Sequence, residues 1–82
     1  MLNVQIRDIV REHGGLEIDF DALEDSADLF DAGLTSLTTV NLMLAIEDQF
    51  DVEFEDDMLV RETFESIDAL VAVVQELTGG NA

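Results

Sequence analysis

The chain has 82 residues, no cysteine and no proline, and its 20 acidic residues against three arginines give a net charge of −17. That length fits one small core, and the missing thiols exclude disulfides and thiolate zinc sites. The negative charge excludes nucleic acid and anionic membranes as partners and favours basic protein surfaces. No apolar run reaches the roughly 20 residues that cross a bilayer. We therefore expect a cytoplasmic protein, and a monomer.

The first predicted element is a helix over residues 2–13. In "LNVQIRDIVREHGG" four apolar residues fall near one helical face, Leu2, Ile6, Ile9 and Val10, and Gly14-Gly15 can end the helix. His13 lies at the edge of that face, where a cationic or hydrogen-bonding side chain suits a helix C-terminus. We therefore interpret His13 as structural, since a catalytic role requires a partner that the sequence does not reveal.

Residues 16–35, "LEIDFDALEDSADLFDAGLT", are predicted to be a long connection between the first two helices. Their apolar residues are separated mostly by acidic ones, as expected of a segment that lies over a helical core. The stretch "LEIDF" alternates like a strand, but no second strand is evident for it to pair with, and a lone strand is not stable. So long a connection in a small domain usually carries function or short local turns.

Ser36 to Phe50 carries the most regular helical pattern in the chain, with two apolar stripes at three-and-four spacing. The first stripe is Leu42, Met43, Ile46 and Phe50, and the second is Leu37, Val40 and Leu44. A single helix in a small bundle rarely needs so wide an apolar surface for the core. Either the second stripe is left for a partner or both stripes are buried, and the pattern alone does not decide between them.

Two shorter signals complete the predicted architecture. Acidic residues at 55–57 favour the N-terminus of a short helix, and Ser66 is a typical N-cap for a last helix that ends at Gly79-Gly80. The predicted fold is all-α, a small four-helix bundle with three longer helices, one short helix and a long connection between helices one and two. Residues 1–78 form the predicted domain, and residues 79–82 a flexible tail.

The chain offers almost no catalytic chemistry. A nucleophilic serine needs a base and a group that orients the base, and His13 is the one histidine. The glycines of a nucleophile elbow are missing around Ser36, where Leu34 and Thr38 stand instead. A calcium loop fails in "DLFDAGL" because Phe30 occupies its third position. We therefore predict neither an enzyme nor a metal site.

Ser36 is better suited to being modified than to catalysis. Gly33 permits a sharp reversal of the chain, and the helix N-terminus after it offers free amides and a positive dipole to an anion such as a phosphodiester. Alternatively, Ser36 or Thr35 is simply an N-cap, a role that both residue types often fill. Both interpretations hold if Thr35 caps the helix while Ser36 stays exposed.

The stretch "DAGLTSLTTVNLMLAIEDQF" resembles the acyl carrier protein family, and the likeness extends over nearly the whole chain. In that family an aspartate, a glycine and a Ser-Leu pair precede and open the second helix, and Asp31, Gly33, Ser36 and Leu37 match them. The segments "LAIEDQFDVEF" and "TFESIDALVAVV" match as well. The resemblance implies a carrier domain over residues 1–78 in which a phosphopantetheinyl transferase esterifies Ser36 with 4′-phosphopantetheine.

The resemblance also implies what the chain does and with which proteins. The thiol of the arm carries the cargo as a thioester, so a protein without cysteine can still take part in thioester chemistry. The family's second helix presents carboxylates and a few apolar side chains to basic surfaces on transferases, synthases and ligases. The corresponding partner-binding positions are Leu37, Val40, Asn41, Leu44, Glu47, Asp48, Asp56 and Asp57.

Three positions depart from the family pattern. Thr35 replaces the aspartate that commonly precedes the serine, and Thr38 and Asn41 stand where many members carry acids. Negative charge is therefore missing close to Ser36, although the chain as a whole is very acidic. These departures point to a transferase other than the usual one and to partners outside housekeeping fatty acid synthesis.

The leading hypothesis is a discrete carrier that holds acyl or aminoacyl groups as thioesters. It includes a fatty acid or polyketide carrier and, as an alternative, an aminoacyl carrier loaded by a separate adenylating amino acid ligase. A long acyl chain would need an expandable cavity among the helices, which bulky side chains would limit: Phe20, Phe30, Phe50, Phe54 and Phe64. A hypothesis of another class is an acidic non-carrier module that inhibits a protein by covering its basic surface.

Overall fold

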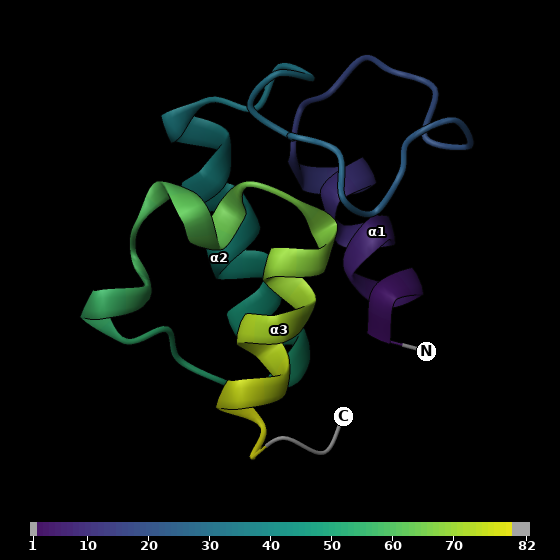
Figure 1. Ribbon diagram of the computed structural model, residues 1–82. Coiled ribbons are helices and arrows are strands. Elements are labelled where there is room, and N and C mark those ends of the chain that lie inside the picture. The colour runs from purple at the N-terminus through teal and green to yellow at the C-terminus, as the bar shows by residue number, and fades with distance from the viewer. Residues whose placement is uncertain (1, 80–82) are drawn as a thin grey trace.

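The computed structural model describes residues 2–79 and shows an all-α fold (Figure 1). Its three α-helices are α1 (Leu2–His13), α2 (Ser36–Phe50) and α3 (Ile67–Leu77). Two short 3₁₀-helices, η1 (Asp56–Met58) and η2 (Arg61–Phe64), lie between α2 and α3. The predicted architecture is confirmed, and its short fourth helix consists of these two 3₁₀ pieces. Of the predicted flexible tail, residues 80–82 lie outside the described residues.

The core lies where the apolar faces of the three α-helices meet. α1 packs against both α2 and α3, and η2 packs against α3. The residues that meet there recur at three-and-four spacing, so each helix places one face in the core. The fully buried members on the α-helices are Ile6, Val10, Leu42, Ile46, Ile67, Leu70 and Val74. None of the described helices has both the length and the apolar character that a bilayer crossing requires.

The connection between α1 and α2, residues 14–35, arcs over one end of the helices (Figure 1) and forms no strand within the described residues. Two backbone hydrogen bonds tie it to the start of α3. The Leu29 N–H donates to the carbonyl of Glu65 at 2.7 Å, and the Asp68 N–H donates to the carbonyl of Asp25 at 3.0 Å. Burial of apolar side chains fastens the rest of the connection: Leu16, Phe20, Leu29 and Leu34.

Arg7 holds the same connection from the α1 side. Its guanidinium donates to the carbonyls of Phe20 and Leu23 and to Oδ1 of Asp25, each at 2.6 Å. The hydrogen bond from Arg7 is the main cause that lowers the pKa of Asp25 below its ordinary value of 3.8. One cation thus satisfies two carbonyls and one carboxylate of a segment that has little regular structure of its own.

Candidate functional site

The chain turns sharply just before α2. Gly33 has a φ of 119°, a conformation that residues with a Cβ rarely adopt. The carboxylate of Asp28 accepts the Phe30 N–H at 2.9 Å, and the Leu34 N–H donates to the carbonyl of Leu29 at 2.9 Å. The side chain of Leu34 is buried, which fixes the chain as it enters the helix. The reversal predicted at Gly33 is therefore confirmed.

Thr35 is the N-cap of α2. Its hydroxyl oxygen accepts the Thr38 N–H at 3.2 Å, and Oγ1 of Thr38 accepts the Thr35 N–H at 2.9 Å, so the two threonines form a capping box. Thr38, a position at which many family members carry an acid, thus takes the part that glutamate or glutamine usually plays in this motif.

Ser36 is left exposed by this arrangement. Within the described residues its hydroxyl has no hydrogen-bond partner, and only its carbonyl is engaged, by Oγ1 of Thr39 at 2.6 Å. The two interpretations of the helix start therefore hold together: Thr35 caps α2, and the hydroxyl of Ser36 is free for modification at the positive end of the helix dipole.

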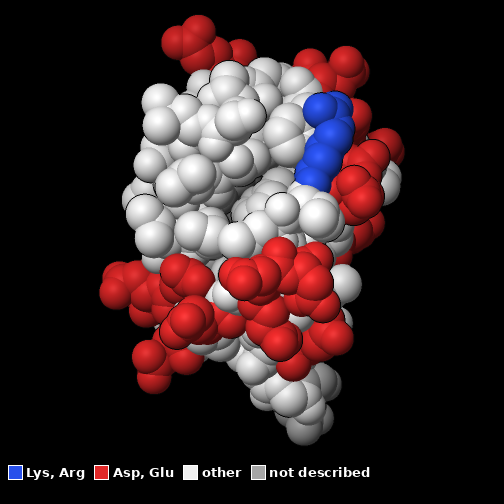
Figure 2. Space-filling model, turned by 90° about the vertical axis from the view of Figure 1, so that its left-hand side faces the viewer, with Lys and Arg blue, Asp and Glu red and all other residues white. Residues whose placement is uncertain are grey.

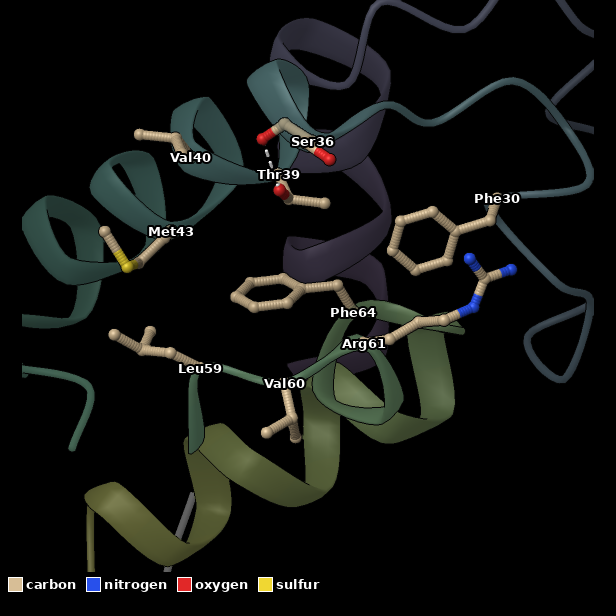
Figure 3. A pocket seen from close by; sticks show the side chains of 9 residues that line it. All are labelled: Phe30, Ser36, Thr39, Val40, Met43, Leu59, Val60, Arg61 and Phe64. Atoms are coloured by element: carbon tan, nitrogen blue, oxygen red, sulfur yellow. Dashed lines mark hydrogen bonds between the residues drawn. The ribbon is translucent and has the colours of Figure 1, made fainter. Parts of the chain in front are cut away.

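An open groove of about 370 Å³ lies beside Ser36, between α2 and the segment that carries η1 and η2 (Figure 3). Most of its lining side chains are apolar: Phe30, Ser36, Thr39, Val40, Met43, Leu59, Val60, Arg61 and Phe64. The groove was not predicted from the sequence, because its walls come from two separate stretches of the chain, residues 30–43 and 59–64. A signal was present in "MLVRE", where three adjacent apolar residues, Met58, Leu59 and Val60, interrupt an acidic stretch.

Arg61 stands at the edge of the groove opposite Ser36 (Figure 3). Its guanidinium lies 4.2 Å from the centre of the Phe30 ring, close enough for a cation–π interaction. Arg7 and Arg11 each lie within 4.0 Å of a carboxylate, whereas within the described residues Arg61 has no such ion pair. The ring of Phe30 therefore holds the third cation of the chain at the groove.

The second apolar stripe of α2 is exposed. Relative exposure is 73% for Leu37, 47% for Val40 and 54% for Leu44, whereas Leu42 and Ile46 of the first stripe are fully buried. The alternative in which both stripes are buried is therefore wrong. Residues 32–46 contain no charged side chain, and Figure 2 shows a broad uncharged face beside a band of acidic groups. A protein of strongly negative charge thus has a neutral, partly apolar surface beside Ser36.

The remaining residues of the predicted docking surface differ in their accessibility. Asn41, Asp48, Asp56 and Asp57 are exposed, as a docking role requires. Glu47 is half-buried, and its Oε2 accepts the backbone N–H at position 54 at 2.9 Å. One oxygen of Glu47 is thus used to hold the segment after α2, which sequence reasoning missed because that contact depends on the loop conformation.

Comparison with known proteins identifies the chain. The family model described as "Phosphopantetheine attachment site" matches residues 4–74. The chain belongs to this family of phosphopantetheine carrier proteins. The predicted cofactor, 4′-phosphopantetheine, is confirmed at the level of the family, and the carrier is not an enzyme. The alternative of an acidic inhibitor module is wrong.

Some of the proteins to which the carrier is similar are named as aminoacyl carriers or were solved with a glycine ligase. The carrier is 43% identical over 79 residues to an "Aminoacyl carrier protein" of Agrobacterium fabrum, covering 96% of the carrier and 95% of that protein. It is also similar, with a TM-score of 0.88 and 43% identity over 93% of the carrier and 99% of the matched chain, to a structure of an engineered Bradyrhizobium japonicum glycine:[carrier protein] ligase complexed with the Agrobacterium tumefaciens carrier protein and ATP.

A further solved structure bears on the cargo. The carrier matches, with a TM-score of 0.71 and 33% identity, a complex of the Bradyrhizobium japonicum glycine:[carrier protein] ligase with a glycylated carrier protein, over 87% of the carrier and 95% of the matched chain. A similarity of 33% also extends to an "Acyl carrier protein" of a Picosynechococcus species, over 80% of each chain. Together these relatives favour the aminoacyl alternative over a fatty acid or polyketide carrier.

Proposed function

We propose that this protein is an aminoacyl carrier, with the phosphopantetheine arm on Ser36 and an amino acid loaded by a separate adenylating ligase. The observation that supports it most strongly is the 43% identity to an aminoacyl carrier protein over nearly the full length of both chains. Coenzyme A is the source of the arm, and ATP activates the free amino acid as its adenylate. Because both are cytoplasmic metabolites, we also propose that the carrier works in the cytoplasm.

The surroundings of Ser36 fit a phosphodiester. Its hydroxyl is exposed and unpaired within the described residues, because Thr35 and Thr38 satisfy the first turn of α2 with each other. The stretch 32–46 has no carboxylate that would repel the new negative charge, and the dipole of α2 attracts it. When bound, the arm supplies the thiol that holds cargo as a thioester. The protein's own residues supply the attachment atom and its exposure.

Glycine is the amino acid that we propose as cargo. Solved complexes of similar carriers contain glycine:[carrier protein] ligases, and one contains a glycylated carrier. A small polar aminoacyl group needs no burial in the protein, because its ammonium is better solvated in water than in an apolar core. The proposed loading enzymes are therefore a phosphopantetheinyl transferase that accepts Thr35 before the serine and a glycine ligase.

Loading by glycine can be measured directly. The phosphopantetheine form is incubated with glycine, ATP and the Bradyrhizobium japonicum ligase, and the intact mass is followed. We expect a gain of one glycyl group per chain, and its removal by hydroxylamine, because a thioester is cleaved by that nucleophile. The form without the arm serves as the control and should gain nothing. Absence of glycyl transfer, together with ready malonyl transfer from malonyl-coenzyme A by a malonyl transferase, would instead support an acyl carrier.

We also propose that partners dock on the exposed side chains of α2 next to Ser36, with acidic residues at the edge. The support is the exposure of three apolar side chains on one helix face, with the carboxylates of Asp48, Asp56 and Asp57 exposed beyond them. Exposed apolar side chains gain free energy when a partner removes them from water, whereas charges at the rim of an interface mainly change association rates. Glu47 contributes less directly, because one of its oxygens is already engaged.

Truncating the most exposed of these side chains tests the docking surface. Leu37→Ala should raise the KM of the ligase for the carrier about fivefold or more, as expected for an interface anchor, with little change in thermal stability. Val4→Ala is the matched control, since Val4 is 51% exposed on α1. Equal KM values for both variants would place the interface elsewhere.

A further inference from the structure

The groove beside Ser36 is bounded by a stacked pair of phenylalanines. The Phe64 ring lies in the groove wall, below Thr39 in Figure 3, and is 6% exposed. Its centre lies 5.8 Å from that of the Phe54 ring, and the two planes are 11° apart. Phe54 is 7% exposed and does not line the groove, so the stack extends from the groove wall into the core.

The phenylalanine pair, Phe54 and Phe64, is held from two sides. The backbone N–H of Phe54 donates to Oε2 of Glu47 at 2.9 Å, which attaches this residue to α2. Phe64 is the last residue of η2, and Ser66, two residues later, caps α3 by accepting the Ala69 N–H at 3.0 Å. Both rings are thus fixed by the backbone of elements that pack in the core, and moving them would disturb those elements.

We propose that the phenylalanine pair determines cargo class by closing the route from Ser36 to the helical core. The inference rests on the proposed function, because it takes Ser36 as the point of attachment. An acyl chain on the arm gains from leaving water, and beside Ser36 the described residues offer it an open groove rather than an enclosed cavity. An aminoacyl group carries a charged ammonium and loses nothing by staying outside. The pair therefore withholds a buried site from fatty acyl cargo and leaves glycyl cargo unaffected.

The close-packed core supports this assignment. Leu42, Ile46 and Leu70 are fully buried in the same hydrophobic cluster as the pair. A chain of methylenes enters such a cluster only if side chains of similar volume are displaced. Truncation of one ring removes that obstacle, since it leaves a space that an acyl chain can fill.

The experiment compares two arms on the same protein. A broad-specificity phosphopantetheinyl transferase attaches the arm from acetyl-coenzyme A or from octanoyl-coenzyme A, and intact mass verifies each product. In the wild-type protein we expect equal melting temperatures for the two forms and unchanged amide NMR shifts at Leu42, Ile46 and Leu70. In Phe64→Ala we expect the octanoyl form to melt about 5 °C above the acetyl form, with shifted core amides, because the chain fills the new cavity.

Phe20→Ala is the matched control, because Phe20 is similarly buried, at 8% exposure, but does not line the groove. It should lose stability without any octanoyl-specific recovery. If Phe64→Ala does not fold, Phe64→Leu is compared in the same way, with a smaller expected recovery.

Two outcomes would overturn the proposal. One is an octanoyl form of the wild-type protein with a raised melting temperature and shifted core amides, which means that the chain enters despite the pair. The other is a folded Phe64 variant that shows no octanoyl-specific gain. A protein that takes up neither arm would count against Ser36 as the attachment site, and the mass spectrum separates that failure from the two above.

Discussion

Ser36→Ala is expected to abolish the attachment of phosphopantetheine completely while leaving the fold intact. The hydroxyl of Ser36 is the atom that we propose to be esterified, and no other group can replace it in the variant. Because that hydroxyl is exposed and caps nothing, its removal should change the free energy of unfolding by no more than about 0.5 kcal/mol. The measurement is the intact mass after incubation with coenzyme A and a broad-specificity transferase, with circular dichroism to verify the helices.

Two control variants, one at a serine and one at a threonine, test whether the loss of loading is specific to Ser36. Ser26→Ala removes an exposed serine from the connection and should be loaded like the wild type. Thr35→Ala removes the cap instead, which should cost about 0.5–2 kcal/mol of stability and yet leave loading possible. A Ser36→Ala protein that still gained the group would show that another residue carries the arm.

Arg7→Gln is expected to have the largest effect on stability. The change removes three hydrogen bonds of 2.6 Å and leaves two carbonyls and the Asp25 carboxylate without their donor. A loss of about 3 kcal/mol is expected from hydrogen bonds to a charged group, lowering the melting temperature by more than about 10 °C in a domain of this size. Thermal and urea unfolding of the folded variant measure it.

Arg11→Gln is the matched control, because it removes the same charge from the same helix. Arg11 pairs with Asp8 at 3.0 Å, and the two side chains are 50% and 56% exposed. An exposed pair of this kind contributes at most about 1 kcal/mol. If the two variants lost equal stability, net charge and not the contacts of Arg7 would be responsible.

The contribution of the Arg7 ion pair depends on pH in a defined direction. Because the hydrogen bond from Arg7 lowers the pKa of Asp25, the pair stabilises the fold above the ordinary value of 3.8. That contribution is lost as the pH falls through the lowered pKa of the folded protein. Asp25→Asn should therefore melt below the wild type at pH 7, and the gap should close in strong acid, where repulsion among the other carboxylates has also disappeared.

The elements of the fold could be predicted because their signals are local. The helix faces follow from residue spacing, and Ser66 and the glycines after α1 and α3 mark ends that depend on near neighbours only. The exposure of Ser36 beside a capping Thr35 was predictable as one of two alternatives. The pattern could not show whether the second apolar stripe of α2 is buried with the first or left exposed, since that depends on how α1 and α3 pack against the helix.

The groove and its surroundings could not be predicted because they depend on contacts between distant segments. Arg61 approaches the ring of Phe30 across 31 positions of the chain (61 − 30 = 31). Glu47 bonds the backbone of Phe54 only because the loop after α2 turns back toward that helix. The sequence shows that these residues are present, but their contact partners depend on how the chain folds.

Because the stretch 32–46 is uncharged, the encounter of the carrier with a partner and the lifetime of their complex should depend on different forces. While a basic partner is still distant, it experiences the charge of the whole carrier, so the rate of encounter should fall as salt shortens the Debye length to about 8 Å at physiological ionic strength. Once the two surfaces touch near Ser36, the contact contains few charged side chains that dissolved salt could screen. The lifetime of the complex should therefore be nearly independent of salt. Ionic strength would then control how often the carrier meets an enzyme, and hydrophobic contact would control how long it stays.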